Sequence, residues 1–312
     1  MSQANLLVPG AGGPAGINII KMFKNEESYK GKIIAIDCDP YASGFFLADK
    51  YFVIPKTSES AFENSIIKII EDNDIGLILP TNESTLNFFS GKKSFFQEKG
   101  IHCLFNDPSV MEICEDKWKF FETLQNNIQP PETSLVLLSS FPQIVKPRKG
   151  SGSRGFNVIN ESINYIHNNN QSMIYQEYLP GKEVTVDILY DMCGNYLYSV
   201  CRERMAVKAG ISTKGRVFHD EIIENESKKI CDLINIKGPI NIQFKQNTKG
   251  KWKILEINPR FGGGTIFTHL AGINIVKFIM YIINSSVSVF PENKIKKNAI
   301  VVRYFEEILL TE

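Results

Sequence analysis

Short apolar runs alternate with segments of helical apolar spacing along the N-terminal third of the chain. The apolar runs predict strands over Asn5–Val8, Lys32–Ile36, Ile75–Leu79 and Ile101–Phe105. The segments between them predict helices that include Ile17–Phe23, Ser60–Asn73 and Leu86–Lys99. Strands that alternate with helices are typical of a doubly wound parallel sheet, whose ligands bind beyond the carboxyl ends of the strands. We therefore expect an α/β domain with a small-molecule pocket at that edge.

The pattern changes beyond residue 107, where strands follow one another with fewer helices between them. Helical spacing predicts helices over Ser109–Asn126 and Asp220–Leu233. Apolar alternation predicts strands over Ser172–Leu179, Glu183–Leu189, Tyr196–Arg204 and Ile240–Lys245. In Glu183–Leu189 the polar residues Glu183, Thr185 and Asp187 should share one face. The sequence thus predicts a second, α+β domain, with the boundary near residue 107.

Composition argues against several classes of function but does not identify one. The 312 residues carry a formal net charge of +1, with 43% hydrophobic and 22% charged residues. This balance gives no reason to expect nucleic acid or an anionic membrane as a partner, and no apolar run approaches the ~20 residues of a membrane span. The six cysteines and four histidines show no paired metal-site spacing. We expect reduced thiols in a cytoplasmic protein.

A glycine-rich turn follows the first strand, at Pro9–Gly16. Such a turn between strand and helix can present backbone N–H groups to a phosphate, and Asp37 and Asp39 follow the next strand where a dinucleotide fold holds its ribose. The turn therefore allows a nicotinamide cofactor as one interpretation. The spacing of its glycines is a loose version of the dinucleotide pattern, so an ordinary polar turn is the competing interpretation.

A strand near the C-terminal end, Trp252–Ile257, leads into a proline and glycine loop. Side chains two residues apart share a face of a strand, so Glu256 and Asn258 should point together and Leu255 and Ile257 into a core. A carboxylate and an amide oxygen side by side are ligands that Mg²⁺ accepts. A polar strand end without a ligand is the simpler alternative.

The preceding strand, Ile240–Lys245, should pair with this one across the turn at 247–250. Such a pair would let Gln243 face the same site as Glu256 and Asn258. Arg260, just past the strand end, could reach a phosphate on a metal held there. Three oxygen donors and one cation are thus expected to converge.

A basic hairpin forms the second chemically informative stretch, at Gln143–Val158. A strand delivers Lys146, and the loop that follows is rich in glycine, serine and the cations Arg148, Lys149 and Arg154. Glycines let backbone N–H groups approach an anion closely, and no helix with the Walker pattern follows. The stretch therefore predicts a mobile hairpin that closes over phosphates, with an unliganded basic hairpin as the alternative.

These motifs together resemble the ATP-grasp superfamily. The resemblance rests on Lys146–Gly155, on Gln176–Glu183, on Gln243 and on Glu256–Arg260. It is strongest to the synthetase domains of the carbamoyl-phosphate synthase large chain and to single-module carboxylate–amine ligases. It implies a pre-ATP-grasp (Rossmann-like) domain at 1–107 and an ATP-grasp domain at 108–312, with a mobile lid subdomain at about 118–180.

The resemblance implies roles for residues at the motif positions. Those matching the family's nucleotide contacts are the phosphate lysines Lys117 and Lys146, the lid residues Gly152 and Ser153, the adenine-hinge residues Glu177 and Leu179, the ribose acid Glu183 and the loop residues Gly210 and Ile211. Those matching the Mg²⁺ (or Mn²⁺) ligands are Gln243, Glu256 and Asn258, of which Gln243 and Glu256 also touch the nucleotide. Arg260 matches the catalytic cation near the transferring phosphoryl group.

The implied activity is an ADP-forming ligase that joins a small carboxylic acid to an amine through an acyl phosphate. Arg202 or Arg204 is our candidate for the substrate carboxylate, since arginine binds one bidentately. With one module and no glutaminase, the chain is not expected to make carbamoyl phosphate itself, and homodimers are common in the family. Two alternatives stay open: a catalytically silent ATP-binding regulatory module, and a nicotinamide-dependent oxidoreductase.

Overall fold

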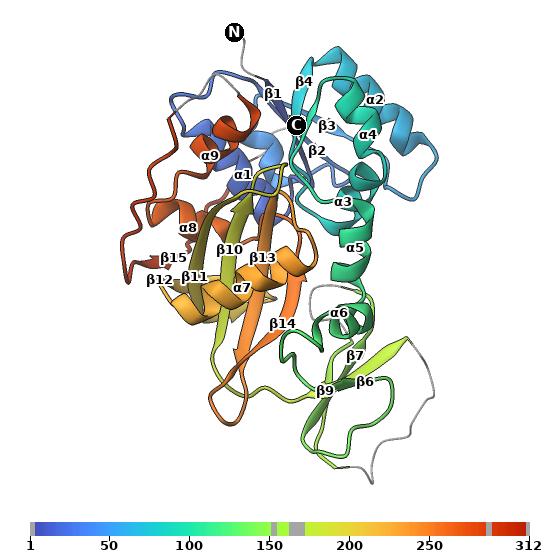
Figure 1. The fold of residues 1–312 in the computed structure, drawn as a ribbon. Coiled ribbons are helices and arrows are strands. Elements are labelled where there is room, and N and C mark those ends of the chain that lie inside the picture. Colours follow the sequence, from blue (N-terminus) through green and yellow to red (C-terminus); the bar gives the residue numbers. More distant parts are fainter. Residues whose placement is uncertain (1–3, 151–154, 162–171, 285–288, 310–312) are drawn as a thin grey trace.

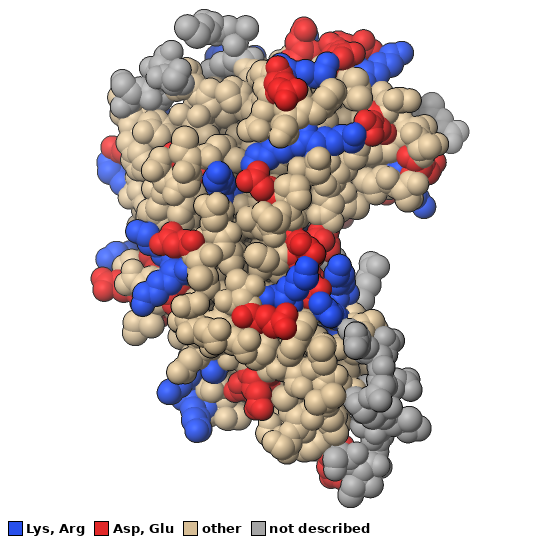
Figure 2. Space-filling view, turned by 45° about the vertical axis from the view of Figure 1, so that its right-hand side comes forward, with Lys and Arg blue, Asp and Glu red and all other residues tan. Residues whose placement is uncertain are grey.

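The computed structural model describes residues 4–150, 155–161, 172–284 and 289–309, which form three sheets (Figure 1). We call them the N-terminal sheet, the small sheet and the central sheet. Within the described residues, no helix has the length and apolar character needed to cross a membrane. Figure 2 shows that basic and acidic side chains are interspersed over one face of the molecule, as the near-zero net charge suggests.

The N-terminal sheet is parallel, with the strand order β3-β2-β1-β4-β5. Its strands are β1 (Asn5–Pro9), β2 (Ile33–Asp37), β3 (Lys50–Val53), β4 (Ile75–Ile78) and β5 (His102–Cys103). Its helices are α1 (Pro14–Lys24), α2 (Ala61–Asp72), α3 (Glu83–Gly91) and α4 (Lys93–Glu98), with the 3-10 helix η1 (Ser43–Phe46). Helix α1 packs on one face and α2 to α4 on the other. The predicted doubly wound sheet is confirmed.

Two details of this region differ from the prediction. The helix expected over Leu86–Lys99 is interrupted between Gly91 and Lys93, where Lys92 leaves the helical backbone region with φ −117°. The edge strand β3 was not predicted from the sequence, because it is only four residues long and its side chains are mostly exposed. Neither feature carries the apolar periodicity on which the predictions depended.

The small sheet has the strand order β6-β9-β7-β8 and forms a separate lobe at the bottom of Figure 1. Its strands are β6 (Thr133–Ser134), β7 (Gln143–Pro147), β8 (Asn157–Ile159) and β9 (Met173–Glu177). The chain reaches it through α5 (Pro108–Glu115) and α6 (Lys117–Leu124), where one helix over Ser109–Asn126 was expected. Asp116 separates the two helices, since its carboxylate caps α6 by accepting the N–H groups of Trp118 and Lys119 at 3.1 and 3.2 Å.

The central sheet is antiparallel, with the strand order β14-β13-β10-β11-β12-β15. Its strands are β10 (Glu183–Tyr190), β11 (Tyr196–Lys208), β12 (Ile211–Phe218), β13 (Pro239–Gln246), β14 (Trp252–Asn258) and β15 (Ile300–Val302). Helix α7 (Glu221–Leu233) covers one face, and α8 (Thr265–Leu270) and α9 (Ile275–Ile283) lie toward α1.

The two faces of the central sheet differ in character, as the alternation in β10 predicted. Val184, Val186 and Ile188 are buried in an apolar cluster with α7, so the polar residues between them point to the opposite face. The prediction for Leu255 was wrong, because a bulge in β14 leaves this side chain half-buried. The bulge separates the pair of Phe244 and Ile254 from the pair of Gln243 and Glu256, so Ile254 enters the core instead.

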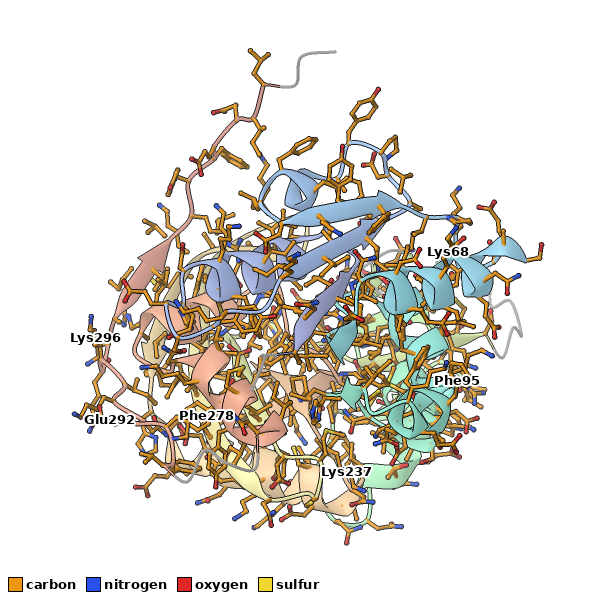
Figure 3. The ribbon with its side chains drawn as sticks, turned by 90° about the horizontal axis from the view of Figure 1, so that it is seen from above. Lys68, Phe95, Lys237, Phe278, Glu292 and Lys296 are labelled. Atoms are coloured by element: carbon orange, nitrogen blue, oxygen red, sulfur yellow. The ribbon has the colours of Figure 1, made fainter. Side chains whose placement is uncertain are left out.

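One apolar cluster joins the N-terminal sheet to the central sheet. It contains Leu6 and Val8 of β1, Ile19 of α1, and Tyr198 and Phe278 from β11 and α9. The rings of Tyr198 and Phe278 meet edge to face, with centroids 5.0 Å apart. Figure 3, seen from above, labels Phe278 on the helix that lies beside the N-terminal sheet, lower in that view. This shared core fixes the N-terminal domain over one end of the central sheet's polar face.

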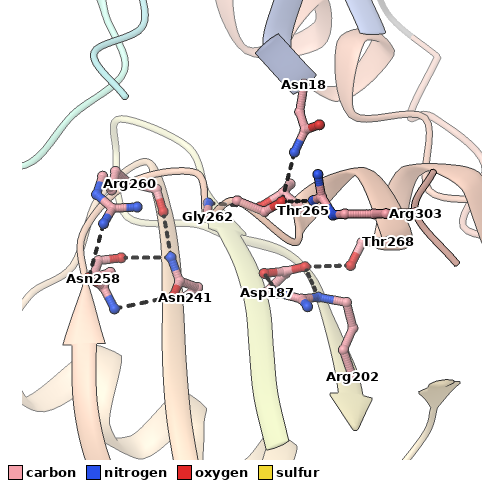
Figure 4. Close-up of polar contacts among 11 residues, drawn as sticks. Asn18, Asp187, Arg202, Asn241, Asn258, Arg260, Gly262, Thr265, Thr268 and Arg303 are labelled. Atoms are coloured by element: carbon pink, nitrogen blue, oxygen red, sulfur yellow. Dashed lines mark hydrogen bonds and ion pairs between the residues drawn. The ribbon is translucent and has the colours of Figure 1, made fainter. Parts of the chain in front are cut away.

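A buried ion pair lies under that covered end (Figure 4). The guanidinium of Arg202 donates twice to the carboxylate of Asp187, at 2.6 and 2.9 Å, and both side chains are at most 4% exposed. Thr268 of α8 also donates to Asp187, at 2.5 Å. A side chain at Gly264 would collide with Arg202, so the glycine allows the loop after β14 to pass directly over the guanidinium.

We expect Arg202→Ala to lower the free energy of unfolding by about 3 kcal/mol, because removal of one partner leaves the Asp187 carboxylate buried without its cation. Urea denaturation monitored by circular dichroism measures the change. The matched control is Arg216→Ala on β12, whose ion pair with Glu203 is longer, at 3.8 Å, and exposed to solvent. The control should change stability by less than about 0.5 kcal/mol. Equal effects of the two substitutions would contradict this account of Arg202.

Candidate active site

The predicted metal ligands lie side by side on the polar face of the central sheet. Gln243 on β13 is directly opposite Glu256 on β14, and Asn241 is opposite Asn258. The Asn258 amide donates to the Glu256 carboxylate at 3.2 Å and accepts from Arg260 at 3.3 Å. The structure therefore brings together the carboxylate, the two amide oxygens and the cation that were predicted from the sequence.

These groups fit a hard divalent cation. Mg²⁺ is commonly held by one or two carboxylates together with substrate phosphates and water, and one carboxylate with two amide oxygens leaves room for both. Within the described residues there is no cluster of three or more His, Cys, Asp or Glu that would hold a metal by itself. The donor set of Glu256, Gln243 and Asn258 thus suits a metal that arrives with a phosphorylated ligand.

Asn241 was not predicted as a site residue, although it fixes the end of β14. Its amide donates to the backbone carbonyl of Arg260 at 3.1 Å and lies 3.5 Å from that of Asn258 (Figure 4). A buried asparagine within a strand leaves no mark in apolar periodicity, which explains why the sequence did not reveal it.

Two lysines from the small-sheet lobe face Glu256. Lys146 on β7 donates to the side chain of Gln176 on β9 at 2.7 Å, and burial lowers its pKa to about 8, although the charge of Glu256 acts in the opposite direction. Lys117 at the start of α6 donates to the carbonyl of Gly150 at 2.7 Å. Burial lowers its pKa too, against the charges of Glu256 and Glu83. Both lysines are therefore poorly solvated cations on which the charge of Glu256 acts.

Arg260 is a third cation near Glu256. Burial lowers its pKa, and the nearby charges of Glu256 and Glu83 partly offset this. Glu83 begins α3 of the N-terminal domain, beside the turn at 81–84 that follows β4. This turn lies beyond the carboxyl end of β4, at the edge where the sequence predicted a small-molecule pocket. The charge of Glu256 acts on all three cations and burial disfavours the charged form of each, so a ligand with further negative charge would stabilise them.

The predicted ribose residue lies further along the same face, and the predicted hinge residues lie at the end of β9 in the small sheet and just after it. Glu177 at the end of β9 accepts the N–H of Glu132 at 3.3 Å and the amide of Asn247 at 3.4 Å, and Leu179 is buried. Glu183 forms an ion pair with Arg204 at 2.7 Å. Gly210 lies in the turn between β11 and β12 and Ile211 is the first residue of β12, while Gly152 and Ser153 lie outside the described residues. Glu183 thus lies on β10 beside β13 and β14, which carry the predicted metal ligands, whereas Glu177 approaches them from the small sheet through its contact with Asn247.

The prediction that Arg202 or Arg204 binds the substrate carboxylate changes with the structure. Arg202 does hold a carboxylate bidentately, but it is that of Asp187 within the chain. Arg204 contacts Glu183 and Gln243, two residues assigned to the nucleotide and metal. The Arg202 guanidinium is therefore already paired within the chain, and the Arg204 guanidinium lies among residues assigned to the nucleotide.

The N-terminal glycine turn uses its donors within the chain. The N–H groups of Gly10 and Ala11 bind the carbonyl of Ile36, at 3.0 and 3.3 Å. The N–H of Gly12 donates to the Asp37 carboxylate at 2.8 Å. Asp37 also accepts the N–H of Asp39 at 3.1 Å. The groups that a dinucleotide would need thus bind one another, which disfavours the nicotinamide interpretation.

A cavity of about 490 Å³ lies away from this constellation. It is bounded by the end of α4, β5, the β10–β11 turn and the end of α9, and its lining includes His102, Cys103, Asp191, Met192 and Tyr281. It contains none of the predicted site residues, so the charged constellation on the polar face is the stronger candidate for chemistry.

Two family models match the chain in the order that this architecture suggests. Residues 6–104 match the PylC-like N-terminal domain. Residues 169–308 match the model described as ATP-grasp in the biosynthetic pathway with Ter operon. The second match includes Glu177, Glu183, Gln243 and Glu256.

A curated relative and two solved structures agree with these matches. The carbamoyl phosphate synthase large chain of Clostridium botulinum (strain Eklund 17B / Type B) is 27% identical over 79% of this chain, which spans only 25% of that relative's length. Biotin carboxylase from Campylobacter jejuni superposes with a TM-score of 0.72 at 16% identity, over 96% of this chain and 75% of that one. L-amino acid ligase from Bacillus licheniformis superposes with a TM-score of 0.66 at 14% identity, over 91% and 75%.

The structural similarities establish the fold, since their sequence identities are low. The family is identified by the sequence matches, together with the motif residues on the polar face of the central sheet. The chain belongs to the ATP-grasp superfamily, with a PylC-like N-terminal domain and sequence relatives among the large chains of carbamoyl phosphate synthase.

Proposed function

We propose that the protein is an ADP-forming carboxylate–amine ligase, which activates a small carboxylic acid with Mg-ATP and joins it to an amine. The observation that carries the proposal is the placement of Glu256, Gln243 and Asn258 on one face of the central sheet, with Lys117 and Lys146 near Glu256 from the neighbouring lobe. The domain division at about residue 107, with a lid at about 118–180, is part of the same proposal.

Phosphoryl transfer requires positioning and charge neutralisation more than covalent help from the protein. Glu256, Gln243 and Asn258 would hold the metal, which supplies positive charge to the phosphate oxygens when bound. Lys117 and Lys146 would bind the β- and γ-phosphates. Arg260, held at the end of β14 by its bonds to Asn258 and to the carbonyl of Phe261, would face the transferring phosphoryl group.

Each bond change can be assigned. A carboxylate oxygen of the acid attacks the γ-phosphorus, and the bond from that phosphorus to the β,γ-bridging oxygen breaks, which gives an acyl phosphate and ADP. The amine lone pair then attacks the acyl carbon, the C–O bond to phosphate breaks, and the amine loses a proton. The cations gathered around Glu256 stabilise the negative charge that develops in the first step.

The names of similar proteins support a ligase activity, but they do not identify the substrates of this chain. The relative described as an L-amino acid ligase shares the fold, and the Campylobacter jejuni biotin carboxylase structure is a complex with β-γ-ATP. We therefore include amino acids among the candidate acids and amines, and take ATP with Mg²⁺ as the cosubstrate and metal.

We expect the protein to release ADP and form a hydroxamate when incubated with Mg-ATP, pooled amino acids and small carboxylic acids, and hydroxylamine. Glu256→Ala should lower both products by about 100-fold or more, because it removes the carboxylate of the metal set. Glu203→Ala is the matched control, since Glu203 lies on β11, pairs with Arg216 and is outside the constellation.

The nucleotide product separates the mechanisms. AMP in place of ADP would contradict an acyl phosphate, because it would mean adenylation. Mg-ATP binding with no turnover over the whole pool would favour a nucleotide-binding regulatory module. Equal activity of Glu256→Ala and the control would contradict the assigned site.

We expect the affinity for Mg-ADP to fall as the pH rises above about 8, because Lys146 has a pKa of about 8 in the unliganded protein and loses its charge there. Below that pH the lysine is protonated and the affinity should be nearly constant. Lys146→Arg should flatten the profile, since a guanidinium stays charged throughout. Isothermal titration calorimetry from pH 6.5 to 9.5 measures the effect, and parallel profiles for the two proteins would contradict this role of Lys146.

A further inference from the structure

Arg204 occupies a central position in the candidate active site that no family motif explains. Its Nη1 forms an ion pair with the Glu183 carboxylate at 2.7 Å and donates a hydrogen bond to the Gln243 side-chain oxygen at 3.0 Å. Through Nη2 it donates to the carbonyl of Gly210 at 2.8 Å. One cation thus joins the proposed ribose acid, a proposed metal ligand and the loop that borders the nucleotide.

From this position we propose that Arg204 binds the phosphates of the nucleotide that lie between the ribose and the metal. The inference rests on the proposed function. In a bound nucleotide the α- and β-phosphates connect the ribose to the metal-bound end. Nη1 lies between Glu183, at the ribose end, and Gln243, at the metal end, and therefore on that line.

One N–H group of the Arg204 side chain has no acceptor among the described residues. The side chain is only 9% exposed. Its Nε is buried, and no residue that the structure describes accepts its hydrogen. A buried donor without a partner is costly, and a ligand oxygen that supplies the missing acceptor is a common reason for one to persist. Phosphate oxygens are strong acceptors for a planar guanidinium.

The predicted metal at Gln243 gives a second reason to expect a phosphate beside Arg204. Gln243 cannot offer the same oxygen lone pair to a metal and to Nη1 without placing two positive charges side by side. A metal on Gln243 would take the acceptor of that hydrogen bond, so Nη1 would need a second acceptor beside Glu183. The adjacent phosphates would supply it. The contacts with Glu183 and Gln243 hold the guanidinium close to where the phosphates would lie.

The test compares ligands with and without phosphates. We expect Arg204→Gln to weaken Mg-ADP binding by about 10- to 100-fold, the range for a lost charge-assisted hydrogen bond. Its affinity for adenosine should stay within about twofold, since adenosine carries no phosphate. Isothermal titration calorimetry measures both, with Arg216→Gln as the matched control on the neighbouring strand.

A second variant, Arg204→Lys, keeps a cation beside Glu183. It replaces Arg204→Gln in the experiment if the glutamine variant does not fold. It should weaken Mg-ADP binding several-fold, because an ammonium lacks the planar fork of donors, and leave adenosine binding unchanged.

Three outcomes would overturn the inference. Equal losses for Mg-ADP and adenosine would mean that Arg204 only supports Glu183. Unchanged or tighter Mg-ADP binding in either variant would mean that Arg204 makes no useful phosphate contact. A wild-type protein that binds neither ligand would overturn the proposed function itself, whereas wild-type binding with unaffected variants overturns only the role of Arg204.

Discussion

The pairing of β13 with β14 is the constraint on which the candidate site depends. Side chains alternate strictly along a strand, so a slip of one residue would turn Glu256 and Asn258 into the apolar cluster beneath α7. The register that places Gln243 opposite Glu256 is fixed because Ile242 and Ile257 are buried on the other face. The bulge at Leu255 adjusts the strand so that both Ile254 and Ile257 reach the core while Glu256 keeps its partner. The register that buries the apolar residues of β13 and β14 therefore also brings the candidate metal ligands together.

Charge is balanced differently at the two ends of the polar face. At the end covered by the N-terminal domain, the charge of Arg202 is balanced inside the protein by Asp187, under a loop whose glycine leaves room for the guanidinium. At the end that carries Glu256, Lys117, Lys146 and Arg260 all act on this carboxylate, and burial disfavours the charged form of each cation. A polyanionic ligand would supply the balance that the chain itself does not. The same kind of residue is thus structural at one end and suited to a ligand at the other.

The sequence predicted those features that periodicity and local motifs encode. The alternation in β10, the pairing of Gln243 with Glu256 and the parallel N-terminal sheet all follow from the spacing of apolar residues. Breaks within helices were missed, since Asp116 ends one helix and caps the next through a side-chain contact that periodicity does not show.

Contacts across strands far apart in the sequence were also beyond prediction. The preference of Arg202 for Asp187, and of Arg204 for Glu183, depends on which residues the register places in reach. The role of Asn241 at the end of β14 has the same origin. The glycine turn after β1 showed a true local pattern, but only the structure revealed that its N–H groups are already bonded to Ile36 and Asp37.

The most direct test of the central claim is a thermal unfolding series with ATP and NADH, each with and without Mg²⁺, for the wild type and Glu256→Ala. If the polar face of the central sheet binds a metal–nucleotide complex, ATP should raise the melting temperature of the wild type only when Mg²⁺ is present. The variant should lose that increase, and NADH should have no effect on either protein. Stabilisation by NADH, or stabilisation by ATP that needs neither Mg²⁺ nor Glu256, would contradict the account.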